Sequence, residues 1–375
     1  MSEVPEPIPD DTDDEDELLP VPGVGRRVEL TVQPKTFGMR LDQYLVLQFP
    51  DFSRSVIQKA IESGSVTVHD TVRRASYKTR LGDHIAIQLP EPERPEPTPE
   101  DIPLEVLYED EYLAIVNKPY DMVVHPAKGH WSGTLVNALA FRFANLSQEG
   151  GAYRAGIVHR LDRDTSGAIL IAKEERTHRE LSMQFETRKV FKEYVAITQG
   201  VLDRDSDYIE RRIAHHPHDR VKMIATDEEH GKEACTFYEV LERFDGYTLV
   251  RCQPRTGRTH QIRVHLASVG AAVLADKIYS GRDHFCLSDL KPDVDPANDE
   301  VLMPRQALHA QRLRVVHPIK NEVLAVCAPL PPDFVRTLAA LREYRAWRPV
   351  SRDAKSSERS AKPASHSAPP TTRRG

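Results

Sequence analysis

The sequence is poor in the features that mark secreted, membrane-spanning and redox-active proteins. Its four cysteines, at positions 235, 252, 286 and 327, include no C-x-x-C pair, which excludes a zinc ribbon or a redox dithiol and favours buried thiols. No run of eighteen apolar residues occurs, and the N-terminus is acidic and contains several prolines, unlike a secretory signal. These absences predict a cytoplasmic protein without a membrane segment.

The patterns that bind nucleotides and metal ions are missing as well. Neither G-x-x-x-x-G-K nor G-x-G-x-x-G occurs, so a nucleotide cofactor is not expected. His260 and His265 are five residues apart, which is off the spacing of a zinc-binding helix, and His215, His216 and His218 flank a proline in a predicted turn. We therefore expect no cofactor and no metal ion.

Charge is divided unevenly along the 375 residues. The net charge is −6, but residues 1–25 carry nine acids and no Lys or Arg, which leaves +3 for the remainder. Residues 1–26 are therefore predicted to form an acidic disordered tail, and residues 347–375, rich in Ser, Pro and basic side chains, a basic one. Between the tails, a hydrophobic content of 39% and the length predict about two folded domains.

A small domain is predicted over residues 27–89. The second of its helices begins after Ser53, a good N-cap, and ends near Gly64. Residues 90–103 contain six prolines and five acids and are expected to form an extended linker. The elements expected in the small domain are strands at residues 28–32, 65–69 and 84–88, and helices from residue 40 and over residues 54–62.

A larger domain, residues 104–346, is predicted to be α+β. Strands outnumber helices, and few helices fall where a parallel crossover needs one, which favours a mixed, largely antiparallel sheet with flanking helices. Residues 281–306 are polar and contain proline, so we expect a long surface excursion there. The expected strands are 104–108, 112–119, 190–198, 234–241, 247–252 and 323–326, and the expected helices are 134–140, 175–188, 259–268 and 334–344.

A charged loop between two apolar segments is the first candidate for chemistry. Residues 156–158 and 168–172 are predicted to be short buried strands, and H-R-L-D-R-D-T-S-G lies between them. Arg160 and Arg163 flank Asp162, and cationic neighbours favour an ionised carboxylate. On these residues alone, Asp162 is either a catalytic carboxylate or part of a salt-bridged turn.

A second candidate is the sequence G-R-T-H-Q-I-R at residues 257–263. The predicted helix places Thr259, Arg263 and Leu266 on one face, behind a glycine turn. Arg263 would then project from the first turns of the helix toward a carboxylate. The alternative is a structural arginine paired with a core acid, and the same residue can serve both purposes.

Residues 38–90 resemble the S4 RNA-binding domain in the order of their motifs. R-L-D-x-x-L starts at residue 40, F-P-x-x-S-R-S at 49, G-x-V-x-V at 64 and G-D-x-I at 82. In that family basic residues on the second helix and the following loops contact phosphates, with little reading of sequence. The alternative is an amphipathic helix pair with a solvated charged face. The resemblance implies phosphate contacts from Arg54, Lys59, Arg73, Arg74, Lys78 and Arg80.

With H-R-L-D-x-x-T-S-G and G-R-T-H-Q-I-R, residues 38–345 resemble the RluA/RluD family of RNA pseudouridine synthases. The resemblance implies that Asp162 is the catalytic aspartate, that Arg263 pairs with it, and that Tyr194 stacks on the target uracil and can serve as a later base. Ala275, before Asp276, departs from a glycine-like position of the family but is not expected to touch the chemistry. Further substrate contacts are expected from Arg160, which would hold the duplex open, and from His159, Arg258 and His260.

The resemblance also defines the expected reaction. Uracil is detached, rotated and rejoined through carbon, which requires no cofactor, and Asp162 either attacks the sugar carbon or removes a sugar proton. The S4-bearing layout is most similar to members that act on 23S ribosomal RNA, free or in the assembling large subunit, and we expect a monomer without an obligate protein partner.

Two other classes of protein compete with this interpretation. A catalytically silent RNA-binding or ribosome-assembly protein would not need the intact Asp162, Tyr194 and Arg263. A hydrolase or nuclease with paired acids would need a second carboxylate, and Asp164 is the one candidate near Asp162 in the sequence.

Overall fold

The computed structural model describes residues 27–347, except residues 35, 50–51, 53, 89–96, 127–130, 150, 292, 296 and 298. The acidic tail, nearly all of the basic tail, much of the predicted linker and the N-cap predicted at Ser53 lie outside the described residues. The chain divides into two compact units. The first holds residues up to 163, 168–190 and 314–326, and the second holds residues 164–167, 191–313 and 327 onward.

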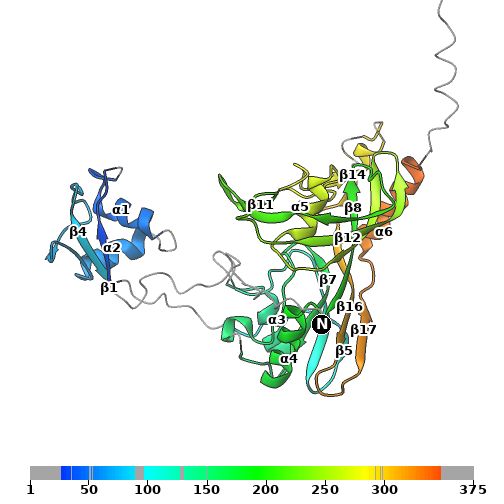
Figure 1. Ribbon diagram of the computed structural model, residues 1–375, viewed down its shortest axis with the longest axis horizontal. Helices are drawn as coiled ribbons and strands as arrows, with labels where there is room; N and C mark the ends of the chain where they lie inside the picture. Colours follow the sequence, from blue (N-terminus) through cyan, green and yellow to red (C-terminus); the bar gives the residue numbers. More distant parts are fainter. Residues whose placement is uncertain are drawn as a thin grey trace, which may run out of the picture. The chain divides into compact units, whose positions relative to one another are not determined.

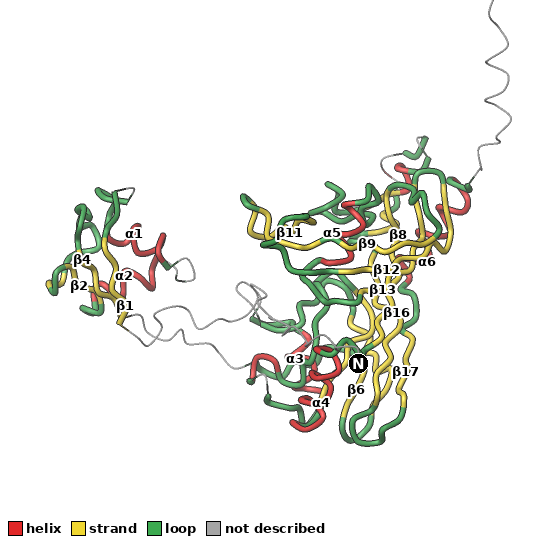
Figure 2. The backbone as a smooth tube through the Cα atoms, viewed as in Figure 1, coloured by secondary structure: helices red, strands yellow, loops and turns green. Residues whose placement is uncertain are grey.

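The N-terminal part of the first unit is a four-stranded antiparallel sheet with two helices (Figure 2). In its central strand, buried Ile85 and Ile87 alternate with more exposed neighbours, as in a strand with one face against a core. The sheet order is β1-β4-β2-β3. The elements are β1 (Arg27–Thr31), α1 (Leu41–Gln48), α2 (Arg54–Glu62), β2 (Val66–Val68), β3 (Thr71–Val72) and β4 (His84–Gln88).

The elements predicted for this small domain are confirmed, and α2 and β4 have the predicted bounds. The alternation of apolar and polar residues predicts these strands because each of them buries only one face. The two-residue strand β3 is exposed on both residues, so no alternation of burial marks it and the sequence pattern does not predict it.

Most of the strands from residue 105 onward form one large mixed sheet (Figure 1). Its order is β5-β6-β7-β16-β8-β13-β12-β9, with β17 paired to β16. The pairs β5–β6, β8–β13, β13–β12 and β12–β9 are antiparallel, whereas β7 and β16 are parallel. The strands are β5 (Glu105–Glu109), β6 (Leu113–Lys118), β7 (Ser166–Ala172), β8 (Phe191–Gln199), β9 (Ser206–Glu210), β12 (Cys235–Phe244), β13 (Tyr247–Pro254), β16 (Leu308–Val316) and β17 (Val323–Cys327).

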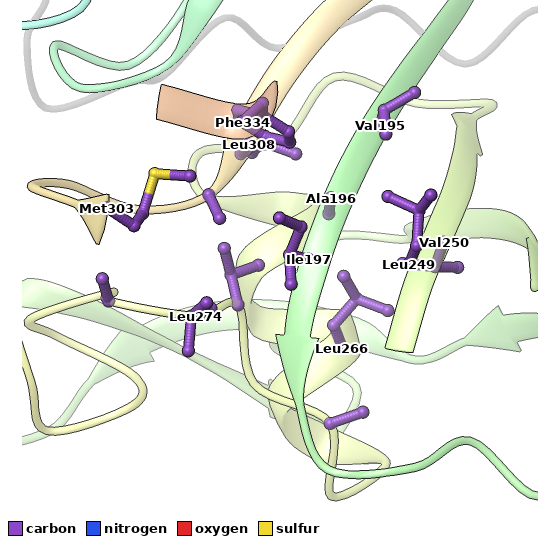
Figure 3. Close-up of a cluster of buried hydrophobic side chains, with 14 of the residues drawn as sticks. Val195, Ala196, Ile197, Leu249, Val250, Leu266, Leu274, Met303, Leu308 and Phe334 are labelled. Carbon is purple, nitrogen blue, oxygen red and sulfur yellow. The ribbon is translucent and has the colours of Figure 1, made fainter. Parts of the chain in front are cut away.

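Short elements and helices complete the larger part. In the second unit, two helices share a core with the sheet, and Figure 3 shows Ile197 of β8, Leu266 of α5 and Phe334 of α6 within one buried cluster. No described helix is long and apolar enough to span a membrane. The elements are α3 (Leu135–Arg142), η1 (Ala152–Arg154), α4 (Glu175–Glu186), β10 (Arg212–His216), β11 (Asp219–Thr226), α5 (Gln261–Ser268), β14 (Phe285–Cys286), η2 (Leu287–Asp289), β15 (Val301–Met303) and α6 (Pro332–Tyr344).

The predicted α+β class is confirmed, but two local predictions are wrong and one strand of the sheet was not predicted. The long polar excursion ends in strand β15 and in buried Arg305 and Gln306, because these polar side chains form internal hydrogen bonds. The expected strand at residues 156–158 contributes a single bridge, from Ile157 to Ile171. Strand β16 is not predicted from the sequence, although it lies inside the sheet, since polar residues interrupt its apolar pattern.

Gly167 permits the close approach of β7 to β16. Its φ is +119°, and a Cβ placed on it would collide with the backbone carbonyl of Ala310, its neighbour in the parallel pairing. The residues of the charged loop therefore enter the sheet through a position that suits glycine alone.

We predict that Gly167→Ala lowers the free energy of unfolding by roughly 3 kcal/mol, from backbone strain and overpacking together. Gly246→Ala is the matched control, because Gly246 also has a positive φ, +83°, but nothing lies within 4 Å of an added Cβ. That control should cost only about 1 kcal/mol. Urea unfolding of both variants measures the difference, and equal losses would contradict the proposed collision.

Candidate active site

A buried lysine fixes the backbone directly after Asp162. Lys118, at the end of β6, is 0% exposed, and its Nζ donates to the carbonyl oxygens of Pro119 at 2.9 Å, Met122 at 2.8 Å and Arg163 at 2.9 Å. The Arg163 carbonyl also accepts from the Met122 amide at 3.3 Å. An ammonium group removed from water needs such partners, so the loop is bound to β6 at the residue that follows Asp162.

His159 and Arg163 hold the same loop from their side chains. The His159 Nε2 accepts from the Leu170 amide of β7 at 2.9 Å, and its ring stacks on Phe185 of α4 with centroids 4.6 Å apart. A ring nitrogen that accepts from an amide carries no proton, so we assign the proton of the neutral ring to Nδ1. Arg163 donates through Nε and Nη2 to Asp121. Arg160 and Asp162 lie between them and are half-buried.

Arg263 forms a buried ion pair that the sequence motifs did not reveal. Its Nε donates to the Oδ2 of Asp276 at 2.6 Å and its Nη2 to the Oδ1 at 2.9 Å, and the two residues are 4% and 0% exposed. The guanidinium also lies 5.1 Å from the ring centroid of Tyr279. The structural role considered for Arg263 is therefore confirmed. The sequence motifs gave Asp276 no role, but its carboxylate orients the guanidinium of Arg263.

The start of α5 also differs from the prediction. His260 has a left-handed backbone, with φ +55°, and the helix begins after it, so Thr259 does not share a helix face with Arg263 and Leu266. The His260 Nδ1 lies 3.0 Å from the Tyr279 hydroxyl, which accepts from the Met223 amide of β11. Tyr279 therefore connects His260, Arg263 and the β10–β11 hairpin.

Buried Gln261 closes the turn that precedes α5. Its Oε1 accepts from the Thr256 hydroxyl at 2.7 Å and from the Arg258 amide at 3.0 Å, and its Nε2 donates to the Cys235 carbonyl at 3.0 Å. The Arg258 Nε donates to the Glu233 carbonyl at 3.3 Å. The G-R-T-H-Q-I-R sequence thus forms a turn and a helix start whose backbone is held by its own glutamine.

Tyr194 lies in the middle of the sheet, where its backbone is fixed on β8. It is opposite Cys252 of β13 and packs, half-buried, against the core of the second unit. Its neighbour Glu193 is buried and accepts from Gln253 Nε2 at 3.0 Å. A half-buried tyrosine on a rigid strand offers an aromatic face and a hydroxyl at a defined position. Asp162 belongs to the first unit, whereas Tyr194 and Arg263 belong to the second.

The basic residues of the small domain differ in their contacts. Lys59, Arg73 and Arg74 are exposed, as a phosphate-binding surface requires. Arg54, although exposed, donates through Nε at 3.1 Å and Nη2 at 2.7 Å to Asp42, which is 0% exposed. Arg54 therefore joins α2 to α1 in addition to carrying charge at the surface.

Charge on Asp42 is stabilised by a set of donors. Burial alone would raise the pKa of Asp42, but hydrogen bonds from Arg40, Arg54 and Gln58 outweigh it and hold the pKa well below its usual range. The carboxylate thus stays ionised inside the small domain. Among the residues that the structure describes, no three His, Cys, Asp or Glu side chains gather as a possible metal-ion site.

Comparison with known proteins assigns the chain to a family. The RNA pseudouridylate synthase model matches residues 112–268, and the S4 domain model matches residues 39–85. A protein of Aquifex aeolicus described as an uncharacterized RNA pseudouridine synthase is 42% identical over 308 residues, which cover 81% of this chain and 94% of that protein. The chain belongs to the RNA pseudouridylate synthase family.

Two further relatives of this pseudouridine synthase agree with the assignment. A protein of Nitrosomonas europaea described as ribosomal large subunit pseudouridine synthase D is 40% identical over 84% of this chain and 88% of its own length. The structure of human RNA pseudouridylate synthase domain containing 1 aligns with a TM-score of 0.50 at 26% identity, and covers 71% of this chain and 98% of its own. The resemblance found in the motifs is confirmed, and the protein is an isomerase that acts on RNA.

For this synthase we predict that Asp42→Asn lowers the stability of the small domain by about 2 kcal/mol at neutral pH, because the donors of Arg40, Arg54 and Gln58 lose a buried, charged acceptor. The folded pKa of Asp42 lies below its unfolded value, near 3.9, so this stabilisation is complete above about pH 4 and is lost as the pH falls toward the folded pKa. The variant should lack that acid-dependent component.

Hydrogen exchange of the α1 and α2 amides at neutral and acidic pH measures the effect of Asp42→Asn. Asp70→Asn is the control, since Asp70 makes an exposed ion pair with Arg27 and should contribute less than about 1 kcal/mol. If the two variants exchange alike, Asp42 does not stabilise the helix pair.

Proposed function

We propose that this synthase converts uridine to pseudouridine in 23S ribosomal RNA and that Asp162 carries the reaction. The description of the Nitrosomonas europaea relative supports a large-subunit substrate. One observation carries the proposal for Asp162: the carbonyl directly after it is bound by the buried ammonium of Lys118. A carboxylate on a fixed backbone meets the requirement for either attack on the sugar carbon or removal of a sugar proton.

Arg263 would keep Asp162 ionised and oriented. A guanidinium has donors on more than one edge, so Arg263 can bind Asp276 through Nε and Nη2 while it also pairs with Asp162. A cation beside a carboxylate lowers its pKa and so favours the charged form that the reaction uses. Because Asp276 fixes the guanidinium before RNA arrives, little reorganisation would be needed at the chemical step.

Tyr194 would receive the target base. Removal of a uridine from its stack costs a few kcal/mol, and an aromatic face that stacks on the extruded base recovers part of that cost. The half-buried ring of Tyr194 on β8 suits this role, and its hydroxyl would serve as the base of the final proton transfer. Arg160 would occupy the gap where the base leaves the duplex, and His159, Arg258 and His260 would shape the RNA contact.

The small domain would add affinity for RNA with little recognition of the base sequence. Exposed Lys59, Arg73 and Arg74 would neutralise phosphates and release counterions. We infer that residues 27–89 and 104–346 act as separate modules joined by residues 90–103, which agrees with family matches at residues 39–85 and 112–268. A ribosomal RNA substrate also favours a location in the cytoplasm.

We predict that Asp162→Asn abolishes pseudouridine formation and leaves RNA affinity within about threefold, because the amide cannot act as the carboxylate does. The measurement maps pseudouridines in 23S ribosomal RNA from cells in which the gene is deleted and then complemented with either the wild-type protein or the variant. Asp164→Asn is the control and should restore full modification. Pseudouridine formation by Asp162→Asn would contradict the catalytic assignment. Loss of modification in Asp164→Asn would support a mechanism with paired acids. If deletion of the protein leaves the pseudouridines of 23S ribosomal RNA unchanged, the proposed substrate is wrong.

A pair of variants separates the two roles proposed for Tyr194. Tyr194→Phe keeps the stacking face and removes the hydroxyl, so it should bind RNA normally and stop after the base is rejoined through carbon, before the final proton transfer. Tyr194→Leu removes the face as well and should weaken productive binding by about tenfold or more, from a stacking loss of about 1–3 kcal/mol. Single-turnover assays on a 23S fragment measure both. Full activity in Tyr194→Phe would exclude the hydroxyl from proton transfer.

A further inference from the structure

A second buried cation binds the next carbonyl along the catalytic loop. Arg305 is 3% exposed and follows β15. Its Nη1 donates to the Asp164 carbonyl at 3.0 Å, two residues after Asp162. Its Nε and Nη2 donate to the two carboxylate oxygens of Asp333, at 2.8 and 3.1 Å. The same Nη1 also donates to the carbonyl oxygens of Leu308 at 3.2 Å and Gln306 at 3.4 Å. One edge of the guanidinium therefore contacts the loop and the chain that leads into β16, and the other contacts an acid in the first turn of α6.

The residues around Arg305 continue this contact along the chain. Gln306 Nε2 donates to the Thr165 hydroxyl at 2.8 Å, and the Ser166 hydroxyl lies 2.9 Å from His309 Nδ1. His309 then pairs with Ser166 in the parallel register of β7 and β16. The residues just after Asp162 are thus held one after another by the segment that leads into β16.

Together, Lys118 and Arg305 hold the backbone that follows the candidate catalytic residue, Asp162. Lys118 binds the carbonyl of residue 163, and Arg305 binds the carbonyl of residue 164. Two buried cations from distant parts of the chain therefore bind the carbonyl oxygens of the two residues that follow Asp162. Displacement of a catalytic group by about 1 Å can reduce a rate by about a hundredfold.

We propose that Arg305, fixed by Asp333, is a positioning residue for Asp162. The proposal rests on the proposed catalytic role of Asp162. Arginine is required because a planar fork can bind a carboxylate on one edge and a carbonyl on another, whereas the ammonium of lysine is a point donor. Through this residue, α6 at the far end of the chain contributes to the geometry of the catalytic loop.

A purely structural role predicts a different result. If Arg305 only joins α6 to the core, its substitution lowers stability and leaves the chemical step unchanged in the folded protein. A positioning role lowers the single-turnover rate at saturating RNA while RNA affinity stays the same, since the chemical step alone depends on the orientation of Asp162.

The test uses Arg305→Lys in the full-length protein, with a 23S fragment as substrate. We expect a single-turnover rate reduced by about thirtyfold and a dissociation constant within about threefold of the wild type. Thr165→Val, which removes only the acceptor for Gln306, should cause a smaller loss of about fivefold. Leu338→Ala is the control: Leu338 is buried on the same helix, so the variant should lose stability and keep the wild-type rate where it is folded.

Each outcome decides the proposal. A wild-type rate in folded Arg305→Lys overturns it, and so does an equal loss of rate in Leu338→Ala. If Arg305→Lys does not fold, Asp333→Asn replaces it: a slower chemical step with unchanged affinity supports the proposal, and a wild-type rate refutes it. Asp162→Asn is measured alongside. If that variant is active, the proposed function fails whatever Arg305→Lys shows, whereas an inactive Asp162→Asn with a normal Arg305→Lys overturns the positioning role alone.

Discussion

The buried ammonium of Lys118 is the interaction on which the placement of the candidate catalytic loop depends. An ammonium group loses a large hydration energy when it leaves water, and three carbonyl oxygens replace that hydration here. Those carbonyls come from the residue after β6, from the turn that follows and from the loop of Asp162, so these three hydrogen bonds form together only when all three segments are in place. Folding of the first unit and the geometry of the loop are therefore coupled.

The same physical device recurs at other positions that matter for function. Arg263 with Asp276, and Arg305 with Asp333, are buried bidentate pairs, and Asp42 is a buried carboxylate bound by Arg40 and Arg54. Such pairs add less to stability than their contacts suggest, because desolvation opposes the attraction. They do impose orientation, because a planar guanidinium and a carboxylate match in one geometry. In this protein the buried charged groups orient other parts of the structure. They hold α2 against α1, fix the side chain of Arg263 in α5 and bind the segment that follows Asp162.

Much of the fold was predictable where a local pattern reports burial directly. The helix α2 and the strand β4 have the predicted bounds because their apolar residues repeat with one period and end at clear signals. Strand β16 and the segment before it were not predictable in this way. Arg305, Gln306 and His309 are buried polar residues, and their burial depends on partners far away in the sequence. The start of α5 was missed because His260 has a left-handed backbone conformation, which is uncommon for residues other than glycine and which the sequence does not indicate.

Short motifs whose chemistry is local were enough to indicate the family, with its S4 and synthase matches, and to single out the candidate residues. Which groups hold those residues became clear only from the fold. Asp276 was missed as the partner of Arg263, Lys118 reaches a carbonyl 45 residues away, and Arg305 reaches one 141 residues away. The physical reason is that a hydrogen bond depends on two groups meeting in space, and strand order, which no periodicity along the chain encodes, decides which groups meet.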